Sequence, residues 1–482
     1  MQKVLLCVSE PLWFIHKRTV EPQRHGGTEG IVNKTERNVS SKGLIEPRIL
    51  KGFRDYLPSI TIARLEMIRK LERVFASFGF VPIDTPALEY AEILLGKGSD
   101  ETDKQLYRFL DQGERDVALR FDLTVPFARF TAMHLNELAI PFKRFHIAPV
   151  WRAEKPQRGR YREFIQCDFD IIGTDSVLAD AEIVAVIHRA LTALEINHQI
   201  RINNRNLLNG LLQSLGAAGK SVPVLRAIDK LEKLGREVVH EELAREASLS
   251  SKQIEDIFTF LALSTEVGDN AHLIQSLRDR FQGNDQAVLG ISQLETILST
   301  LPSYEIQPEL VRIDLSITRG LDYYTGTVYE TTFLDLPGIG SICSGGRYDN
   351  LAQLYTKQRL PGVGTSIGLD RILGAFEELK RLAEKSATAD VLIALVDEPS
   401  FAQAINLSTK IRNAGLNAEV YPEIGKLGAQ LKYGSKKGIR YVIIAGEREV
   451  SNRVVSIKDL VTGTQTDNVP IGDVVSQLKV MF

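Results

Sequence analysis

The chain has 482 residues, too many for a single hydrophobic core, so we expect about two to four domains. Hydrophobic residues make up 44% of the chain and charged residues 25%, and no apolar run approaches the roughly 18 residues of a membrane-spanning helix. The formal net charge of -2 excludes nucleic-acid binding through overall positive charge, although it leaves room for local basic patches.

The three cysteines, Cys7, Cys167 and Cys343, are far apart in the sequence and include no Cys-x-x-Cys pair. They can form neither a disulfide framework nor a four-ligand zinc site. This usage fits the reducing cytosol, and we predict a cytoplasmic protein with no resident metal.

The first 45 residues differ in character from the rest of the chain. Their apolar run is short and is soon interrupted by Glu10, unlike a signal peptide. Transit peptides avoid acidic residues, whereas this segment contains Glu10, Glu21, Glu29 and Glu36. We therefore predict a flexible extension over residues 1–45.

A packing helix is predicted for residues 61–78, where apolar residues recur at helical spacing. These residues are Ile62, Leu65, Ile68, Leu71, Phe75 and Phe78. The helix should end at Gly79, and a short strand interrupted by Pro82 and Pro86 should follow.

Two alternating segments, 142–152 and 164–172, predict an antiparallel hairpin. In the first, the polar residues Arg144, His146 and Arg152 share one face. In the second, Gln166, Asp168 and Asp170 share one face. The loop between the two segments is basic, so the hairpin should have a long basic tip.

The remaining segments fall into three groups. Residues 204–300 carry charged helical patterns without a cluster of catalytic residue types, which predicts an inserted helical domain. Strand patterns resume at 311–317 and 326–333, and a glycine-rich turn at Gly362, Gly364 and Gly368 should lead into a helix that carries Arg371. From residue 389 onwards, strand and helix patterns alternate as in a compact α/β domain.

The hairpin carries groups that suit a nucleotide and an amino acid. Arg152, Arg160 and Arg162 are planar cations suited to phosphate, while Gln166 and Asp170 could recognise an amine or an imidazole. Simple pairing of opposite charges across neighbouring strands is an alternative interpretation of the same pattern. Arg371 near a helix start could likewise mark either an anion site or an ordinary glycine-to-helix junction.

A second basic patch spans residues 426–440, which contain five basic residues and no acidic one. Such a patch could contact the phosphates of an RNA. It could equally be a solvated surface without a partner.

Five stretches of the chain resemble, in order and spacing, the motifs of a known family. Residues 78–89 ("FGFVPIDTPALE"), 150–173 ("VWRAEKPQRGRYREFIQCDFDIIG") and 362–372 ("GVGTSIGLDRI") resemble the three motifs of class II aminoacyl-tRNA synthetases. Residues 319–330 ("RGLDYYTGTVYE") and 344–351 ("SGGRYDNL") resemble the two signatures of histidyl-tRNA synthetases. The resemblance runs from about residue 45 to the C-terminus.

The resemblance implies an α+β catalytic domain in which helices flank an antiparallel sheet, with a helical insertion and a C-terminal α/β anticodon-binding domain. The corresponding divisions are 46–203 and 301–385 for the catalytic domain, 204–300 for the insertion and 389–482 for the anticodon-binding domain. It also implies a homodimer with the first motif at its interface. The implied reaction activates L-histidine with ATP, accompanied by Mg²⁺, and transfers histidine to the 3′ end of tRNA-His.

The resemblance also assigns residues to the two small substrates. ATP would be bound by Arg152, Glu154, Arg160, Phe164 and Arg371. Arg152 would hold the α-phosphate and Arg371 the γ-phosphate, while Glu154 would face the adenine amino group and Phe164 would stack on the ring. Histidine would be bound by Asp122, Thr124, Arg152, Gln166, Asp170, Arg319, Tyr323 and Tyr324. Asp170 and Tyr324 would read the imidazole, and the catalytic residues would be Arg152, Arg319 and Arg371.

The tRNA contacts implied by the resemblance lie in two places. The loop of the second motif would contribute Gln157 and Arg158, and the C-terminal patch would contribute Lys426, Lys432, Lys436 and Lys437. Asp122 and Asp170 depart from the glutamates of many bacterial members, so the pocket must differ slightly from theirs. How the loop of the second motif reads the acceptor stem therefore stays open.

Two alternatives have other functions. A regulatory paralogue that binds histidine without aminoacylating tRNA usually lacks the "RGLDYY" arginine and the C-terminal domain, and both are present here. A tRNA-binding module with a decayed active site should have lost Arg152, Arg319 or Arg371, and all three are retained.

Overall fold

The computed structural model describes residues 44–95, 103–156, 159–317, 323–382 and 385–482, and the account below concerns these residues. The predicted extension over residues 1–45 lies almost wholly outside them. Among the helices described, none is both long enough and apolar enough to cross a membrane.

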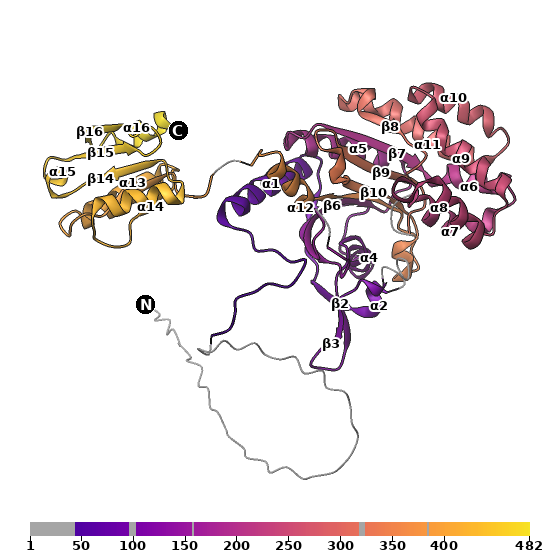
Figure 1. The fold of residues 1–482 in the computed structure, drawn as a ribbon, viewed down its shortest axis with the longest axis horizontal. Coiled ribbons are helices and arrows are strands. Elements are labelled where there is room, and N and C mark those ends of the chain that lie inside the picture. The colour runs from indigo at the N-terminus through magenta and orange to yellow at the C-terminus, as the bar shows by residue number, and fades with distance from the viewer. Residues whose placement is uncertain (1–43, 96–102, 157–158, 318–322, 383–384) are drawn as a thin grey trace, which may run out of the picture. The chain divides into compact units, whose positions relative to one another are not determined.

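The largest sheet in the described part of the chain is a mixed sheet with the strand order β1-β5-β6-β11-β10-β9-β7-β8 (Figure 1). Its strands are β1 (Val81–Pro82), β5 (Phe142–Trp151), β6 (Glu163–Ile172), β7 (His198–Asn204), β8 (Val311–Ile313), β9 (Thr327–Phe333), β10 (Ser341–Tyr348) and β11 (Gly362–Gly368). Neighbouring strands are antiparallel except at the two edges, where β1 lies parallel to β5 and β8 lies parallel to β7. The predicted hairpin is confirmed as β5–β6, with Arg144 opposite Asp170.

The alternation along β6 separates an apolar face from a polar one. Cys167, Phe169 and Ile171 belong to the main core together with residues of α1 (Pro58–Ser77), α5 (Val177–Ala193) and α12 (Leu369–Glu378). The Phe75 ring of α1 lies 4.8 Å, centre to centre, from the Phe169 ring. Because successive side chains of a strand point to opposite faces, this packing directs Gln166, Asp168 and Asp170 away from these helices.

The helix α1 differs from its prediction in the stripe that it buries. Met67, Leu71 and Phe75 are buried at a spacing of four residues, whereas Leu65 is 44% exposed. With 3.6 residues per turn, Leu65 lies about 120° around the helix from Leu71. The apolar residues of this segment therefore predicted the helix correctly but assigned Leu65 to the wrong face.

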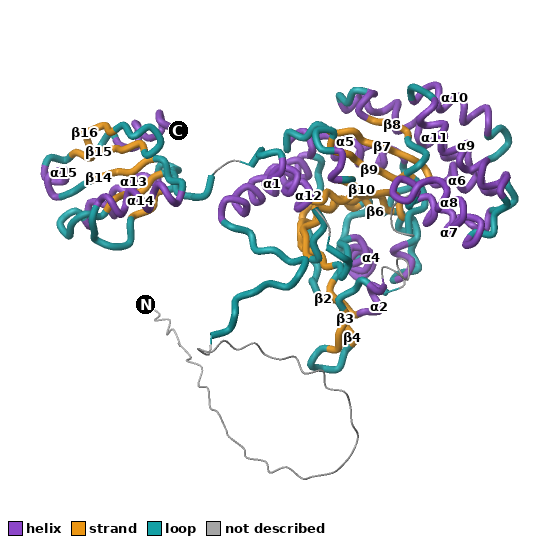
Figure 2. Tube along the Cα trace, viewed as in Figure 1, coloured by secondary structure: helices purple, strands orange, loops and turns teal. Residues whose placement is uncertain are grey.

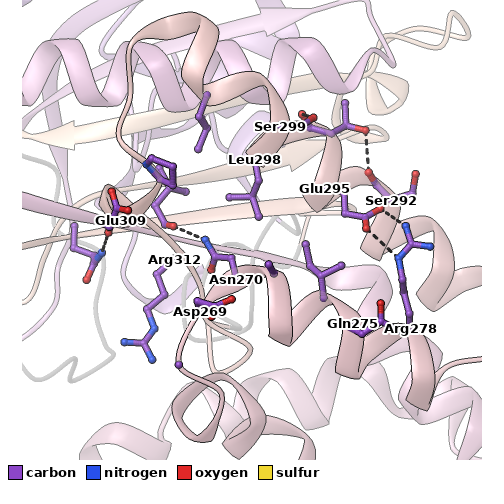
Figure 3. Close-up of a pocket in the computed structure, with 18 residues that line it drawn as sticks. Asp269, Asn270, Gln275, Arg278, Ser292, Glu295, Leu298, Ser299, Glu309 and Arg312 are labelled. Carbon is purple, nitrogen blue, oxygen red and sulfur yellow. Dashed lines mark hydrogen bonds and ion pairs between the residues drawn. The ribbon is translucent and has the colours of Figure 1, made fainter.

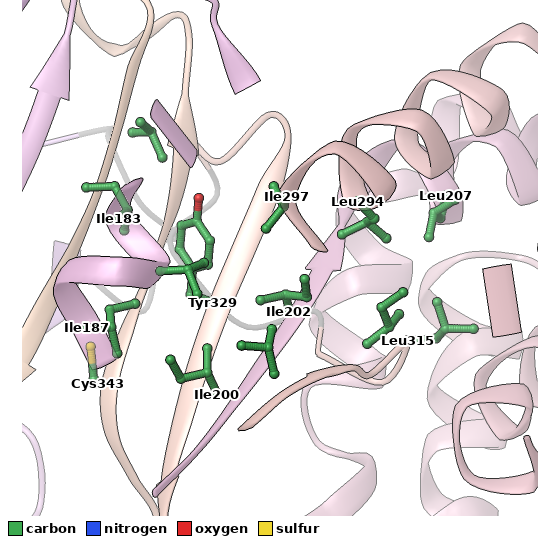
Figure 4. Packing of buried hydrophobic residues seen from close by; sticks show 14 of the residues in the cluster. Ile183, Ile187, Ile200, Ile202, Leu207, Leu294, Ile297, Leu315, Tyr329 and Cys343 are labelled. Carbon is green, nitrogen blue, oxygen red and sulfur yellow. The ribbon is translucent and has the colours of Figure 1, made fainter. Parts of the chain in front are cut away.

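The core continues between the sheet and the helices beyond it (Figure 4). Ile200 and Ile202 of β7 belong to the same cluster as Ile187 of α5 and Ile297 of α11 (Asp285–Thr300), and the figure labels all four. All four side chains are fully buried. At about 25 cal/mol per Å² of apolar surface, this burial is the main contribution that holds the helices on the sheet.

Helices dominate the segment between β7 and β8 (Figure 2). Besides α11 they are α6 (Arg205–Ser214), α7 (Ser221–Ile228), α8 (Leu231–Glu246), α9 (Ser251–Glu266) and α10 (Asn270–Arg280). Ser250 and Gln253 form a capping box at the start of α9, and the Asp269 side chain accepts a hydrogen bond from the His272 N–H at the start of α10. These caps explain why the chain turns sharply between successive helices.

A small sheet and two helices stand on the polar side of β6. The sheet has the order β2-β4-β3, from β2 (Leu88–Tyr90), β4 (Asp116–Leu119) and β3 (Arg108–Leu110), and the helices are α2 (Ala91–Leu94) and α4 (Thr124–Met133). Ala118 of β4 and Val125 of α4 share a buried cluster with Tyr348 of β10. This cluster brings the start of α4 close to the polar face of the main sheet.

The C-terminal region has a separate sheet of order β13-β12-β14-β15-β16. Its elements are β12 (Val391–Ala394), α13 (Phe401–Asn413), β13 (Ala418–Val420), α14 (Leu427–Lys437), β14 (Tyr441–Ile444), α15 (Glu447–Ser451), β15 (Val454–Asp459), β16 (Gln465–Pro470) and α16 (Val474–Met481). The first three strands in the sheet order are parallel, and β15 and β16 are antiparallel additions. The predicted α/β character of this region is therefore confirmed.

Candidate active site

Two adjoining cavities open on the polar face of the main sheet. We call the larger one, of about 300 Å³, the outer chamber and the smaller one, of about 200 Å³, the inner chamber. Their walls have five residues in common, which are Arg152, Gln166, Tyr324, Ser344 and Ser366. A molecule in one chamber can therefore meet a molecule in the other at these side chains.

All five residues predicted for ATP line the outer chamber. They are Arg152, Glu154, Arg160, Phe164 and Arg371. The Arg152 guanidinium lies over the rings of Phe121 and Phe164, 4.2 Å and 5.1 Å from their centres, and its Nε donates to the Phe121 carbonyl. These contacts fix Arg152 at the boundary of the two chambers while its terminal nitrogens stay available to an anion.

Arg371 and Arg160 stand apart from Arg152 in the same chamber. Arg371 lies in the first turn of α12 and donates a hydrogen bond to the Ser341 carbonyl. Arg160 lies 3.5 Å from Glu154. The outer chamber thus presents one arginine directly after β5, one from the basic loop and one from α12, an arrangement suited to a polyphosphate.

Arg162 does not belong to this group, contrary to the expectation from the hairpin. Its guanidinium donates to the backbone carbonyls of Glu154 and Lys51 and is absent from the walls of both chambers. The two-residue period of a strand ends where the loop begins, so the loop geometry decides the direction of this side chain. Arg162 therefore fixes the loop and is not a phosphate ligand in this arrangement.

All described residues predicted for histidine line the inner chamber. They are Asp122, Thr124, Arg152, Gln166, Asp170, Tyr323 and Tyr324. Asp122 accepts a hydrogen bond from the Val125 N–H at the start of α4, 3.0 Å away, which fixes its carboxylate beside Thr124. The Gln166 amide donates to Ser366 Oγ at 2.9 Å, and Gln166 Oε1 has no hydrogen-bond partner.

Asp170 is held from two sides. The Tyr348 hydroxyl donates to Asp170 Oδ1 at 2.6 Å, and Arg144 Nη2 lies 2.7 Å from Asp170 Oδ2. All three side chains are buried. The alternative of cross-strand pairing is therefore realised in the Arg144–Asp170 pair, and the same carboxylate also lines the inner chamber.

A glycine makes room for Asp170. Gly364 of β11 pairs directly with Asp170, and a Cβ at position 364 would collide with the Asp170 carboxylate and the Phe169 carbonyl. The glycines at 362, 364 and 368 were expected in a turn, but they lie in the strand β11. At Gly364 the absence of a side chain is a requirement of the neighbouring carboxylate, not of a turn.

Burial governs the ionisation of the inner chamber. It raises the pKa of Asp122, of Asp168 and of Asp170, because a carboxylate loses its hydration there. Burial also lowers the pKa of Arg152, although Asp122 opposes that effect. A cationic ligand would relieve the excess of buried carboxyl groups.

Several wall residues were not predicted from the sequence. Asp168, Ser344, Tyr348 and Ser366 line the inner chamber, and Glu330 lines the outer one. Asp168 shares the polar face of β6 with Gln166 and Asp170, which is the signal that could have identified it. The two serines carry no such signal, because only the strand register brings them to the wall.

Three predicted residues, Arg319, Gln157 and Arg158, lie outside the described part of the chain. Their predicted roles therefore stay predictions.

The C-terminal basic patch is partly neutralised. Lys437 lies 2.6 Å from Glu419, and Arg440 lies 2.9 Å from Asp459. Lys426, Lys432 and Lys436 are exposed. Of the four predicted lysines, Lys437 is the one whose charge is already matched by a carboxylate.

A larger cavity, of about 940 Å³, lies between α10, α11 and β8 (Figure 3). Asn270, Arg278, Glu295 and Arg312 contribute to its walls, and none of the predicted site residues does. Arg278 pairs with Glu295 across it, and Asn270 donates to the Val311 carbonyl. Its polar groups are thus largely paired with one another, unlike those of the inner chamber.

Comparisons with known proteins agree with the geometry of the two chambers. The family model described as "Histidyl-tRNA synthetase" matches residues 52–372, and the one described as "Anticodon binding domain" matches residues 390–481. The histidine–tRNA ligase of Rhodopirellula baltica is 52% identical over 425 residues, which cover 88% of this chain and 96% of that protein. The histidine–tRNA ligase of Helicobacter hepaticus is 45% identical and is covered to 97% of its length.

Solved structures give the same result. The crystal structure of histidyl-tRNA synthetase from Nostoc sp. PCC 7120 has a TM-score of 0.81 and 33% identity, covering 91% of this chain and all of that one. A Bacillus halodurans protein described as "ATP phosphoribosyltransferase regulatory subunit/histidyl-tRNA synthetase" has a TM-score of 0.67 and 25% identity, covering 80% of this chain and 97% of that one.

Proposed function

Because this chain belongs to the histidyl-tRNA synthetase family, it is a histidine–tRNA ligase, and we propose how its two chambers divide that reaction. The enzyme activates L-histidine with ATP to histidyl-adenylate and pyrophosphate, and then transfers histidine to the 3′ end of tRNA-His. The observation that carries the division is the shared wall: Arg152 and Gln166 border both a small carboxyl-lined chamber and a larger arginine-lined one.

Histidine occupies the inner chamber in this proposal. Asp122, Thr124 and Gln166 bind its amino group, and the free Gln166 Oε1 is an acceptor for an ammonium N–H. Asp170 and Tyr324 bind the imidazole, and Tyr323 shapes the wall beside them. Since Tyr348 and Arg144 hold Asp170, its carboxylate is oriented before histidine arrives.

ATP occupies the outer chamber. Phe164 stacks on the adenine, Glu154 faces the adenine amino group and Arg160 assists in binding. Arg152 lies at the α-phosphate, at the boundary of the chambers, and Arg371 binds the γ-phosphate. Arg319, which lies outside the described residues, is assigned to the α-phosphate by the family resemblance alone.

The chemistry then depends on position and charge. The histidine carboxylate attacks the α-phosphorus, the bond to the bridging oxygen of pyrophosphate breaks, and Arg152 stabilises the negative charge on the phosphoryl oxygens. In the second step the terminal ribose hydroxyl of tRNA attacks the histidyl carbonyl and AMP leaves. Neither step requires a covalent bond to the protein, because both reactants are held at the shared wall.

Mg²⁺ accompanies ATP in this proposal. The carboxylates that border the outer chamber are already engaged: Glu154 by Arg160, Glu330 by Arg201, and Asp370 by the Tyr56 hydroxyl and the Ile165 N–H. They fit a metal that arrives on the phosphates better than one resident in the protein. Bound to ATP, the ion neutralises phosphate charge and assists the departure of pyrophosphate.

The exposed lysines of α14 are proposed to contact the anticodon stem. We expect the double variant Lys432→Ala with Lys436→Ala to bind tRNA-His about tenfold more weakly near 0.1 M salt. Each lysine that is removed leaves one phosphate unneutralised, so binding releases fewer counter-ions from the RNA. The slope of log K against log salt should fall by about one to two units. Filter binding over a series of salt concentrations measures both quantities.

A matched control is available in the same domain. Lys410 on α13 and Lys479 on α16 are also exposed, and their double alanine variant should bind tRNA-His normally. Equal losses in the two double variants would show that α14 has no special role and that the domain binds RNA through its overall charge.

A homodimer is proposed, with the small sheet at its interface. Leu88 and Tyr90 of β2 and Phe109 and Leu110 of β3 are 40–67% exposed, which is unusual for a group of large apolar side chains on one sheet. A second copy of the chain would cover them. Sedimentation equilibrium at micromolar concentration should give twice the 53.8 kDa of one chain, and a monomer would contradict the proposal.

The proposed domain divisions are 46–203 and 301–385 for the catalytic domain, 204–300 for the insertion and 389–482 for the anticodon-binding domain. We propose that the enzyme acts in the cytoplasm, where tRNA is charged. The regulatory alternative is disfavoured because the match to an anticodon-binding domain over residues 390–481 gives this chain a part that a histidine sensor does not need.

Exchange of labelled pyrophosphate into ATP tests the proposed division of the site. Exchange should require L-histidine and should fail with other amino acids, since the inner chamber binds an imidazole. Histidine binding without exchange would favour the regulatory alternative.

A further inference from the structure

One carboxyl group of the inner chamber has no role in the proposal above. Asp168 lies on β6 between Gln166 and Asp170, borders the same chamber and is 2% exposed. Its neighbours across the sheet are His146 on β5 and Ser366 on β11. Asp168 Oδ1 has no hydrogen-bond partner.

Several other buried carboxylates of this protein face a cation. Asp170 has Arg144 at 2.7 Å, and Asp180 accepts a hydrogen bond from Arg347 Nε at 3.1 Å. Within the described residues, Asp168 has no arginine, lysine or histidine at ion-pair distance. When ionised, it would be a buried charge without a counter-ion of its own, which is costly in a protein interior.

The charges around the inner chamber are unequal. Three carboxyl groups, of Asp122, Asp168 and Asp170, and one guanidinium group, of Arg152, line the chamber. Arg144 pairs with Asp170, and Arg120 interacts with Asp168 at longer range. If all the groups on the wall were ionised, the described wall would carry more negative than positive charge. A proton or a cationic ligand can remove that excess.

Apart from the carboxyl and guanidinium groups named above, the titratable groups that face Asp168 are neutral near pH 7. Burial and the charges of Arg144 and Arg120 lower the pKa of His146 to about 4, so its imidazole stays uncharged. Burial raises the pKa of Tyr324 and of Tyr348, and it raises that of Cys343 on β10 to about 12. Burial raises the pKa of Tyr323 as well.

The carboxyl group itself titrates near neutrality. Burial raises the pKa of Asp168 to about 7, with Arg144 opposing the rise and Asp170 adding to it. A carboxyl group with a pKa of about 7 can carry a proton in the empty site at neutral pH and exchange it for a cation.

We propose that Asp168 binds the α-ammonium group of histidine, and that this ammonium replaces the proton carried by the carboxyl group in the empty site. The inference rests on the proposed placement of histidine in the inner chamber. The carboxyl O–H bond breaks, the proton passes to the solvent, and the ammonium N–H donates to the carboxylate; nothing is oxidised or reduced. The ammonium is the partner because it is the one full positive charge of histidine above the imidazole pKa of about 6.5.

The position of Asp168 agrees with this assignment. It lies two residues from Gln166, on the same face of β6, and Gln166 Oε1 is likewise an acceptor without a hydrogen-bond partner. Asp168 and Gln166 together could accept hydrogen bonds from two of the three ammonium N–H groups. Asp170, with both carboxylate oxygens already in contact with Tyr348 and Arg144, needs no further cation.

Isothermal titration calorimetry in two buffers of different ionisation enthalpy tests the exchange, because it counts the protons released per ligand bound. The probes are L-histidinol, which has the ammonium, and imidazolepropionate, which lacks it. At pH 7 the wild-type protein should release more protons with histidinol than Asp168→Asn does, and with imidazolepropionate the two proteins should release equal numbers. Each probe also carries its own imidazole proton, so the comparison is made between proteins and not between probes. The excess should fall towards zero at pH 8.5, where Asp168 is already ionised in the empty site.

The variant Asp168→Asn should thus lose the proton release that is specific to histidinol while still binding histidine. Asp84→Asn is a matched control, because Asp84 contacts His146 and its side chain is 89% exposed. It should release as many protons as the wild type. If Asp168→Asn does not fold, the loss of histidinol-linked proton release by the wild type between pH 7 and pH 8.5 decides by itself.

Equal proton release with histidinol by the wild type and by Asp168→Asn at pH 7 would overturn the inference. A wild-type protein that binds neither histidine nor histidinol would instead overturn the proposed placement of histidine. The two failures are thus distinguishable in one series of titrations.

Discussion

Replacing Arg152 with alanine is expected to lower kcat for histidine-dependent pyrophosphate exchange by about 100- to 1,000-fold. Arg152 borders both chambers and is held by contacts with Phe121 and Phe164, so its charge is directed at the point where the two substrates meet. Removing a preorganised donor from a developing negative charge costs about 2.7–4 kcal/mol in comparable sites. Initial rates at saturating ATP and histidine measure the loss.

The matched control for this variant is Arg359→Ala. Arg359 forms an exposed ion pair with Asp175, outside both chambers, and exposed pairs contribute little to stability. Its exchange rate should remain within about twofold of the wild type. A rate for Arg152→Ala in that same range would show that Arg152 does not act at the reacting phosphate.

The second large effect is expected from Gly364→Ala, which adds a single methyl group. Its Cβ would overlap the Asp170 carboxylate and the Phe169 carbonyl, and the backbone carbonyl cannot move aside without disturbing β6. Asp170 must then shift, and a displacement of about 1 Å at a substrate-binding group can cost about 100-fold. We expect kcat/KM for histidine to fall by about that factor, with little change in the KM for ATP.

Gly374→Ala is the control for the added methyl group. Gly374 lies in α12, where a Cβ would meet no atom within 4 Å, and alanine favours a helix by up to about 1 kcal/mol over glycine. This variant should be fully active and slightly more stable in urea. Normal histidine kinetics in Gly364→Ala would mean that the position of Asp170 is not critical for binding.

The parts of the fold that follow a strong repeating pattern were predictable from the sequence. Polar and apolar residues alternate along most of β6 and in the middle of β5, and this alternation also predicted the polar wall of the chambers. By contrast, β16 reads "QTDNVP", a polar segment without apolar alternation. Its partner β15, not its own residues, makes it a strand, and such tertiary pairing cannot be read from a single segment.

The glycines of β11 show a second limit of sequence interpretation. Glycine is depleted in strands, so Gly362, Gly364 and Gly368 indicated a turn. In the structure, Gly362 and Gly364 face Tyr348 and Asp170 across neighbouring strands, and the missing side chains provide the space for these two groups. Only the register of the strands reveals that requirement.

The site likewise combines residues that a single segment predicts with contacts that depend on distant strands. The residues that the family resemblance assigned to histidine and to ATP line the chambers wherever they are described. The pairing of Asp170 with Arg144, and the lack of a cation beside Asp168, depend on strands far apart in the sequence. Alternation placed both aspartates on one face but could not tell which of them has a counter-ion.

Pyrophosphate exchange by the purified wild-type protein tests the account most directly. With ATP, Mg²⁺ and L-histidine, labelled pyrophosphate should enter ATP, and omission of histidine or its replacement by another amino acid should reduce the exchange to background. Binding of histidine without any exchange would contradict the assignment of ATP to the outer chamber and of histidine activation to the shared wall.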